Sequence, residues 1–321
     1  MQNLVIFGST GSLGKSLVEV LPQYKDVKVR ALTAFSNKNL LYDQGKNFNL
    51  GMDNLFLGEL NGLPLNNVDI VANFLPGTIG IKVLETAIEK GIKVLLGNKE
   101  SIVALGNIFG NSPLIYPVDS EHNAIYEIIA SNPGKKIKKI VIPCSGGPFW
   151  QKPLSELKNI SPKEALLHPK WKMGAKISLE SALLINKGFE IIEAKYLFNL
   201  PLEKIEVLIH PDCIIHGMVY FEDEDLPYAY IAEPDMKEHI ENALLRAMDL
   251  VPPKRNIKQI NPSSYNLFDL DNTELRGIEI VVENFKKNPG NMLNFLEREE
   301  AAIKSFLSEQ ISFLDIYDKL K

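Results

Sequence analysis

The sequence has 321 residues, of which 45% are hydrophobic and 23% charged, and its formal net charge at pH 7 is −5. This balance is typical of a globular protein of two or three domains, and it argues against a surface covered with nucleic-acid-binding residues. Two cysteines, Cys144 and Cys213, are too few for a disulfide framework or a cysteine-built zinc site. We therefore expect a cytoplasmic protein, and with no signal-like or long apolar segment at its start, we expect no membrane association.

The first motif is a glycine-rich turn between a strand and a helix. Residues 4–7 are apolar, residues 8–14 read Gly-Ser-Thr-Gly-Ser-Leu-Gly, and Leu17, Val18 and Leu21 follow at helical spacing. Glycine allows a tight turn and a close backbone approach, and the N–H groups at the helix start can bind a pyrophosphate. An ordinary glycine-rich turn is the alternative, but the strand before it and the helix after it favour dinucleotide binding.

The second predicted strand, residues 27–35, indicates which dinucleotide is bound. It ends in Ser36-Asn37-Lys38-Asn39, with no acidic residue where a cofactor lacking a 2′-phosphate is usually held. Lys38 and its amide neighbours suit an added phosphate, so the sequence favours NADP over NAD. The alternative is an exposed polar loop.

Strands and helices continue to alternate. Residues 68–75 and 93–96 read as strands, with a helix at 78–90 between them and another at 102–109. This rhythm predicts a doubly wound parallel sheet of the Rossmann type, with ligands at the carboxyl ends of its strands. Lys99 follows one such end, as either a substrate-facing cation or a solvated lysine.

A pair of carboxylates follows the next short strand, residues 115–118. Asp119 and Glu121 are two residues apart, and in an extended segment such side chains point the same way, towards one cation. Ligands that are all oxygens favour Mg²⁺ or Mn²⁺ over zinc. Alternatively Asp119 and Ser120 cap the following helix, and we expect His122 to be structural.

Anion-binding chemistry is predicted where the strand at 138–143 ends. It leads into Cys144-Ser145-Gly146-Gly147, which offers a hydroxyl and unhindered N–H groups to an anion. Nothing nearby activates Cys144, so we interpret it as a buried bystander.

Residues 168–193 are the richest segment of the chain. Trp171 and Met173 lie between Pro169 and Gly174, which fits either a mobile lid that excludes water or an ordinary loop with an anchoring tryptophan. Further along, helical spacing brings Asn186 and Lys187 close to Glu190, so one helix can offer a carboxylate to a metal and an amide and ammonium to an anion. A solvated lysine–glutamate pair is the alternative.

The remaining chain predicts a second sheet and a helical end. Residues 138–143, 205–209, 214–221 and 228–232 read as four strands, and we interpret His210 and His216 at strand ends as structural. A helix at 238–249, a proline-bearing linker and helical patterns at 273–287, 292–307 and 312–321 follow. The predicted domains are a cofactor domain at 1–118, a catalytic α+β domain at 119–250, a linker at 251–266 and a small helical domain at 267–321.

These segments, taken in order, resemble a known family. The glycine turn at 8–14, the motifs at 97–101, 117–122, 145–149 and 168–174, Ser181, and Asn-Lys-Gly-Phe-Glu at 186–190 closely resemble 1-deoxy-D-xylulose 5-phosphate reductoisomerases. Ile-Glu-Val-Leu-Ile-His-Pro at 205–211 and Glu-Pro-Asp-Met at 233–236 extend the likeness. The resemblance implies an NADPH- and metal-dependent homodimeric enzyme of the non-mevalonate isoprenoid pathway, with a phosphorylated sugar as substrate.

The resemblance also implies a role for individual residues. Asp119, Glu121 and Glu190 are implied to bind one Mg²⁺ or Mn²⁺. Substrate contacts are implied for Lys99 and Ser120 along the sugar and for Ser145, Ser181, Asn186 and Lys187 at the phosphate, with His168 beside them, and Trp171 and Met173 belong to the lid. NADPH contacts are implied for Thr10, Gly11, Ser12, Leu13, Asn37, Lys38, Asn39, Asn98, Glu100 and Gly174.

Two rival functions remain at this stage. One is another two-domain NADP-dependent dehydrogenase, which needs no site of three carboxylates. The other is a catalytically silent NADP-sensing protein, which is expected to lack a metal ligand or a lid residue, and none is missing from this sequence.

Overall fold

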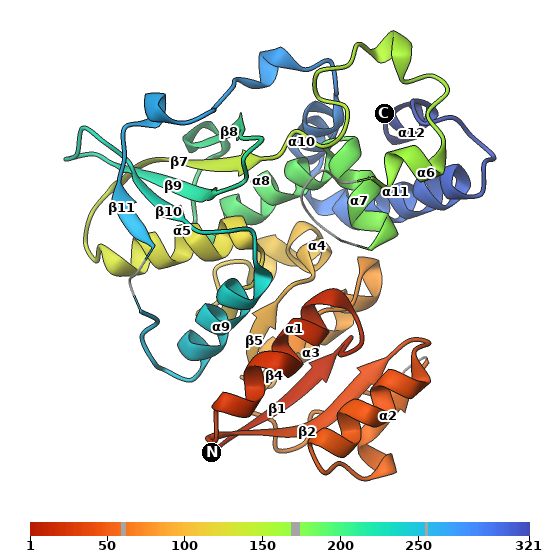
Figure 1. Ribbon diagram of the computed structural model, residues 1–321, viewed down its shortest axis with the longest axis vertical. Helices are drawn as coiled ribbons and strands as arrows, with labels where there is room; N and C mark the ends of the chain where they lie inside the picture. The colour runs from red at the N-terminus through yellow and green to blue at the C-terminus, as the bar shows by residue number, and fades with distance from the viewer. Residues whose placement is uncertain (59–61, 168–173, 254–255) are drawn as a thin grey trace. The chain divides into compact units, whose positions relative to one another are not determined.

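A computed structural model describes residues 1–58, 62–167, 174–253 and 256–321 (Figure 1). The chain forms two compact units that we describe separately. The first contains residues 1–101, 108–123 and 235–253, and the second contains residues 102–107, 124–234 and 254–321. In the described part of the chain, no helix is both long and apolar enough to cross a membrane.

The first unit is built on a parallel sheet of six strands in the order β3-β2-β1-β4-β5-β6. The strands are β1 (Gln2–Phe7), β2 (Val27–Ala34), β3 (Leu55–Leu57), β4 (Ile70–Asn73), β5 (Lys93–Leu96) and β6 (Ile115–Pro117). The order reverses between β1 and β4, and ligands of such sheets bind outside the carboxyl ends of the strands at this point. The predicted doubly wound sheet is confirmed.

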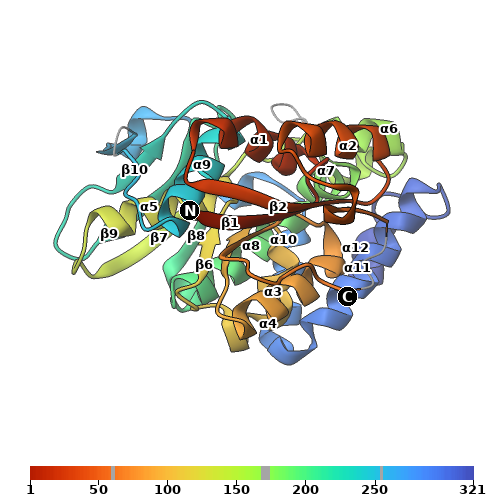
Figure 2. The same cartoon turned by 90° about the horizontal axis from the view of Figure 1, so that it is seen from below.

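Helices cover both faces of this sheet. They are α1 (Ser12–Val20), α2 (Lys38–Asn47), α3 (Ile81–Glu89), α9 (Met236–Ala247) and the beginning of α4 (Lys99–Phe109). Helices α1 and α2 lie on one face and α3 on the other (Figure 2). Leu17, Leu41 and Leu244, from three of these helices, share one core with Leu4 and Ile6 of β1.

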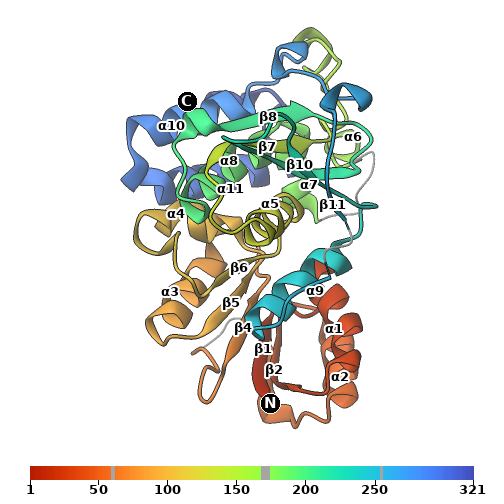
Figure 3. The same ribbon diagram turned by 90° about the vertical axis from the view of Figure 1, so that its left-hand side faces the viewer.

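Helix α9 comes late in the chain but belongs to the first unit. It lies beside α1 (Figure 3) and buries Ile240, Leu244 and Ala247 in the core of that unit. The sequence placed this helix within the segment 119–250 because sequence order was the only guide. The functional boundaries at 118, 250 and 266 stay predictions.

The second unit contains a mixed sheet in the order β11-β10-β9-β7-β8. Its strands are β7 (Ile137–Cys144), β8 (Ile205–Ile209), β9 (Ile215–Phe221), β10 (Tyr228–Ile231) and β11 (Ile257–Gln259). Only the β7–β8 pair is parallel. The predicted count of four strands was one too few, because β11 is three residues long, mostly exposed and inside the expected linker.

One core joins this sheet to the C-terminal helices. The helices are α5 (Ser120–Ser131), which starts in the first unit, α6 (Pro162–Ala165), α7 (Ala175–Ala182), α8 (Ile185–Leu197), α10 (Gly277–Lys287), α11 (Met292–Leu307) and α12 (Asp315–Leu320). Helices α8 and α10 pack side by side (Figure 1). Phe189 of α8 meets Phe295 of α11 edge to face, so the C-terminal helices support the helix that carries the predicted phosphate ligands.

Candidate active site

The glycine turn has the geometry that its sequence predicts. Gly8 adopts φ +81°, and a Cβ there would stand 2.7 Å from the carbonyl oxygen of Phe74. A Cβ on Gly14 would stand 2.3 Å from the carbonyl oxygen of Gly8, so only glycine lets α1 approach the turn this closely. Ser12 and Leu13 begin α1 at the carboxyl end of β1, where the first N–H groups of a helix have no partner within the helix.

The segment after β2 is a helix start and not merely a polar loop. Asn37 caps α2 by accepting a hydrogen bond from the N–H of Leu40 at 3.2 Å, and Lys38 is the first residue of the helix. The sequence missed α2 because Lys-Asn-Leu-Leu-Tyr-Asp-Gln has only a weak apolar period. The result places an ammonium group and a helix N-terminus together beyond the end of β2, which suits a phosphate.

The side chains of Asn98 and Glu100, in the segment after β5, hydrogen-bond to the backbone of the loop after β4. The amide nitrogen of Asn98 donates to the carbonyl oxygens of Leu75 and Gly77, each at 2.8 Å, and its oxygen accepts from Ser101. Glu100 accepts from the N–H of Gly77 at 2.8 Å. The Asn98 side chain is therefore fully used inside the protein.

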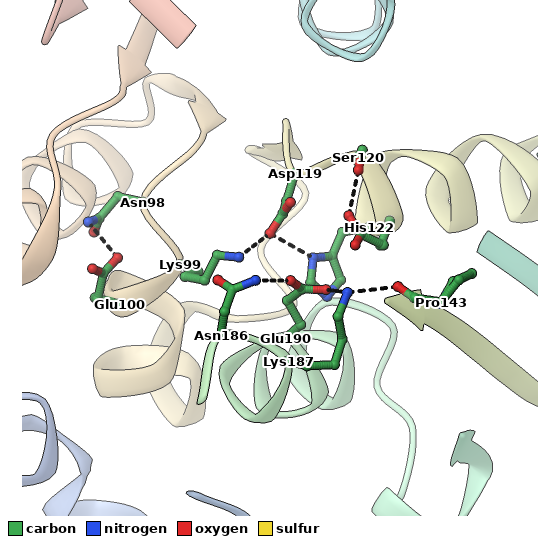
Figure 4. Close-up of polar contacts among 11 residues, drawn as sticks. Asn98, Lys99, Glu100, Asp119, Ser120, His122, Pro143, Asn186, Lys187 and Glu190 are labelled. Carbon is green, nitrogen blue, oxygen red and sulfur yellow. Dashed lines mark hydrogen bonds and ion pairs between the residues drawn. The ribbon is translucent and has the colours of Figure 1, made fainter. Parts of the chain in front are cut away.

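Lys99 and Asp119 form an ion pair within the first unit. The Lys99 Nζ lies 2.5 Å from the Asp119 Oδ2, with 7% and 20% of the two side chains exposed (Figure 4). His122 is fully buried behind this pair, with its Nδ1 3.9 Å from the same oxygen. The lysine that follows the carboxyl end of β5 thus contacts the carboxylate that directly precedes α5.

The carboxylates of Asp119 and Glu121 lie within 4.8 Å of each other, but not because the segment is extended, as the sequence analysis expected. Glu121 belongs to the first turn of α5, where its Oε2 accepts a hydrogen bond from the Ser120 hydroxyl at 2.5 Å. The alternation of an extended strand was therefore the wrong explanation. The alternative in which Asp119 and Ser120 cap the helix stays a prediction, although Asp119 directly precedes α5 and its carbonyl oxygen accepts the Asn123 N–H at 2.8 Å.

The second unit breaks the segment 175–197 into two helices. Helix α7 ends at Ala182, and Leu184 adopts φ 59°, ψ 15° before α8 starts at Ile185. We call residues 183–185 the elbow. Asn186 and Lys187 consequently lie in the first turn of α8, where helix N–H groups and the helix dipole favour an anion.

Glu190 joins the two polar side chains of that first turn. Its Oε1 accepts from the Asn186 amide and its Oε2 from the Lys187 ammonium, both at 2.6 Å (Figure 4). Lys187 also donates to the carbonyl oxygen of Pro143 at 2.8 Å. Lys187 is 3% exposed and Glu190 1%, so the alternative of a solvated pair is wrong.

The predicted serine–glycine loop lies against the end of α7. Gly146 and Gly147 adopt φ +82° and +68°, and the Gly147 N–H donates to the Ser145 hydroxyl at 3.1 Å. A Cβ on Gly147 would stand 2.8 Å from the carbonyl oxygen of Ser181. Ser145, Ser181 and the first turn of α8 therefore belong to one part of the second unit.

The remaining residues that the sequence analysis singled out lie as follows. His168, Trp171 and Met173 lie outside the described residues, and Gly174 is the N-cap residue of α7. Cys144 is buried, as expected of a bystander. His210 and His216 face backbone carbonyl oxygens, those of Asn266 at 2.8 Å and Ala232 at 3.2 Å, in agreement with structural roles.

Sequence reasoning missed a buried cluster of acids beside α7. Lys176 pairs with Glu180 and, at 3.1 Å, with the Oε2 of Glu299 from α11. Burial of Glu299, and secondarily its neighbour Glu180, raise the pKa of the Glu299 carboxyl well above its usual range. Helical spacing brings Lys176 and Glu180 together, but only the tertiary fold brings Glu299 to this pair, so no local pattern reveals the cluster.

This cluster predicts a pH dependence of stability. Because the pKa of Glu299 is higher in the folded than in the unfolded chain, the folded chain binds more protons above about pH 4.3, and stability falls as pH rises. We expect Glu299→Gln to flatten the decline of Tm between about pH 5 and pH 8. Thermal unfolding across that range tests this, with exposed Glu297→Gln as the control. Equal slopes for both variants would contradict it.

Two family models and many curated proteins match this chain. The family model described as 1-deoxy-D-xylulose 5-phosphate reductoisomerase matches residues 4–53 and 60–106, and the model of the family's C-terminal domain matches residues 115–198. A curated reductoisomerase of Thermodesulfovibrio yellowstonii is 36% identical, over 100% of this chain and 91% of the relative. This chain belongs to the 1-deoxy-D-xylulose 5-phosphate reductoisomerase family.

Other members of the family agree with this membership. The reductoisomerase of Lachnoclostridium phytofermentans is 35% identical, over 98% of this chain and 89% of its own. A crystal structure of DOX-P reductoisomerase with NADPH, fosmidomycin and magnesium is 30% identical with a TM-score of 0.85, covering 100% of this chain and 88% of that one. The Zymomonas mobilis enzyme with NADPH is 29% identical with a TM-score of 0.80, covering 99% and 90%.

Proposed function

We propose that this chain converts 1-deoxy-D-xylulose 5-phosphate into 2-C-methyl-D-erythritol 4-phosphate, with NADPH and one divalent cation, in the non-mevalonate isoprenoid pathway. The observation that carries the proposal is the near-complete coverage of curated reductoisomerases, 36% identity over 100% of this chain and 91% of one relative. Family membership does not by itself establish activity, so the proposal also depends on the site residues.

The donor set fits a hard divalent cation. Asp119, Glu121 and Glu190 each offer a carboxylate oxygen, and oxygen ligands suit Mg²⁺ and Mn²⁺. A solved relative contains magnesium. We propose that these three carboxylates hold one ion, two from the start of α5 and one from α8.

The substrate phosphate is proposed to bind at the first turn of α8. Asn186 and Lys187 supply an amide and an ammonium group there, and Ser145 and Ser181 supply hydroxyls from the adjoining loop and α7. Lys99 and Ser120 are proposed to contact the sugar, with His168 near the phosphate. Phosphate binding is remote from the reacting carbons and provides energy to close the lid that holds Trp171 and Met173.

NADPH is proposed to bind along the carboxyl edge of the parallel sheet. The start of α1 offers N–H groups from Ser12 and Leu13 to the pyrophosphate, beside Thr10 and Gly11, while the Gly11 N–H donates to the carbonyl oxygen of Gly8 at 3.0 Å. Asn37, Lys38 and Asn39 are proposed to bind the 2′-phosphate region. Because the Asn98 side chain is fully used, we propose that Asn98 contacts the cofactor through its backbone, near Glu100 and with Gly174 from the second unit.

The protein's own contribution to the reaction is binding and orientation. When bound, the cation polarises the ketone and holds the adjacent hydroxyl, and NADPH supplies a hydride to the branched aldehyde that the rearranged carbon skeleton forms. Lys99 and Ser120 orient the sugar, while Asn186 and Lys187 hold its phosphate. Glu190 links these tasks, because its carboxylate faces the phosphate-binding side chains.

NADPH oxidation by the purified protein tests the proposal. Turnover is expected to require 1-deoxy-D-xylulose 5-phosphate, to stop with excess chelator and to return with Mn²⁺. Another NADP-dependent dehydrogenase would keep its turnover in chelator, and a silent NADP-sensing protein would bind NADPH without oxidising it. Either result would reject the proposed activity.

Cofactor preference tests the proposed role of Lys38. Lys38→Met is expected to lower the preference for NADPH over NADH by about tenfold or more, because the 2′-phosphate loses a charged hydrogen-bond donor. The kcat/KM values for both cofactors measure this. Lys46→Met, at the other end of α2 and paired with Asp43, is the control. Unchanged preference in both variants would place the 2′-phosphate elsewhere.

We propose a cytoplasmic homodimer. On one face of the mixed sheet, Met218 and Ala229 are fully buried, but Leu208, Tyr220 and Ile231 beside them are only partly buried in one chain, and exposed apolar surface favours association. The sequence has only two cysteines, which suits a reducing compartment. Sedimentation velocity tests the dimer, and a concentration-independent monomer would reject it.

A further inference from the structure

The elbow between α7 and α8 is an unusual piece of backbone. Leu184 adopts φ 59°, ψ 15°, in the left-handed region that a branched, non-glycine residue rarely occupies. No side chain caps the start of α8. Such a conformation persists only where the surrounding structure determines it, and such strained residues cluster at functional sites. The direction of the first turn of α8, with Asn186 and Lys187, depends on this elbow.

Two of the C-terminal helices, α10 and α12, contact the elbow directly. A Cβ on Gly277, the first residue of α10, would stand 2.1 Å from the carbonyl oxygen of Leu183 and 2.5 Å from the backbone nitrogen of Ile185. One turn later, a Cβ on Gly188 of α8 would stand 2.7 Å from the Cβ of Val281. Gly277 therefore brings α10 into backbone contact with the elbow, and Gly188 lets the Val281 side chain of α10 pack against the backbone of α8.

Tyr317 of α12 completes this contact with a hydrogen bond. Its hydroxyl donates to the carbonyl oxygen of Leu183 at 2.9 Å, and its side chain is buried. Burial raises the pKa of Tyr317, and the nearby Arg276 partly offsets this. The Tyr317 hydroxyl thus joins α12 to the elbow, and it remains a donor throughout the physiological pH range.

We propose that Tyr317 is a positioning residue for phosphate binding. By holding the Leu183 carbonyl group, it fixes the left-handed Leu184 and aims the N-terminal turn of α8 at the anion. It touches neither substrate nor cofactor and acts through Asn186 and Lys187. This inference rests on the proposed function in one respect, namely that the first turn of α8 binds the substrate phosphate.

Binding of inorganic phosphate to the intact protein tests the inference. Tyr317→Phe keeps the ring and removes only the hydroxyl, and calorimetry is expected to show a Kd for phosphate raised about tenfold, the effect of one lost hydrogen bond on the geometry of the turn. Gly277→Ala pushes a methyl group against the elbow and is expected to act in the same direction. Lys187→Met should abolish most of the binding if the phosphate lies where we place it.

The control must destabilise the same helices without touching the elbow. Phe285→Leu does this, because Phe285 is buried near the end of α10 and its ring meets Tyr196 edge to face. It is expected to lower Tm at least as much as Tyr317→Phe while leaving the Kd for phosphate unchanged. If Phe285→Leu weakens phosphate binding equally, Tyr317 supports only general stability and the inference fails.

The remaining outcomes separate this inference from the proposed function. If Tyr317→Phe binds phosphate like the unmodified protein while that protein turns over 1-deoxy-D-xylulose 5-phosphate, the inference fails and the function stands. If phosphate binding weakens as expected but the unmodified protein shows no turnover, the inference stands and the function fails. If Lys187→Met binds phosphate normally, the anion site lies elsewhere and the inference fails.

Discussion

Replacing Glu190 with glutamine is expected to lower kcat about a thousandfold with Mg²⁺ or Mn²⁺, a loss of ~4 kcal/mol of transition-state stabilisation. Glutamine keeps the shape of the side chain but removes one of three proposed anionic ligands. It also turns an amide group towards Asn186 or Lys187, both of which donate to Glu190 at 2.6 Å. Steady-state turnover with Mn²⁺ and calorimetric titration with Mn²⁺ measure the two consequences separately.

The control for this change is an acid of the same unit outside the site. Glu283→Gln alters a carboxylate of α10 that is 57% exposed, and it should leave turnover and Mn²⁺ affinity unchanged. If Glu190→Gln bound Mn²⁺ normally and turned over at a similar rate, Glu190 would not be a metal ligand. Lost turnover with normal Mn²⁺ affinity would also remove it from the metal site.

Replacing Lys187 with methionine is expected to lower kcat as well as raise KM, with kcat/KM reduced by about a hundredfold. The phosphate is remote from the reacting carbons, so its binding energy is used to close the site and orient the sugar. The ammonium group also neutralises Glu190 and donates to the Pro143 carbonyl oxygen at 2.8 Å, so its loss leaves a buried carboxylate poorly compensated. The lost phosphate binding energy and the poorly compensated Glu190 carboxylate are therefore both expected to lower kcat.

Steady-state kinetics with the phosphorylated substrate distinguish these effects from simple loss of affinity. Lys195→Met is the matched control, since Lys195 lies in the last turn of the same helix and its ammonium lies over the ring of Tyr196. A raised KM with an unchanged kcat in Lys187→Met would show that phosphate binding contributes equally to the ground state and the transition state.

The sequence predicted the strongly apolar strands and the glycine turn, and it failed where elements are short or polar. Residues 4–7 and 93–96 allow few interpretations, whereas β3 and β11 have three residues each and α2 is mostly polar. Helix α9 lies beside α1, although more than 200 residues separate them in the chain. No local pattern encodes such a long-range contact.

The site shows the same division between local and tertiary information. Helical spacing predicted that Asn186, Lys187 and Glu190 approach one another, and their hydrogen bonds confirm it. The elbow at Leu184 was not predictable, because a leucine at this position gives no turn signal and its conformation is imposed by Gly277 and Tyr317. The roles that the family resemblance implies for the lid and the NADPH contacts stay predictions.

The proton NMR spectrum of the product tests the central claim most directly, because it distinguishes rearrangement followed by reduction from reduction alone. After incubation with 1-deoxy-D-xylulose 5-phosphate, NADPH and Mn²⁺, we expect the product methyl group to appear as a singlet, because the branched product carries it on a carbon without hydrogen. A methyl doublet would mean that the ketone was reduced without rearrangement, as a simple NADP-dependent dehydrogenase would do. That result would contradict the proposed reaction and leave only the cofactor-binding half of the account.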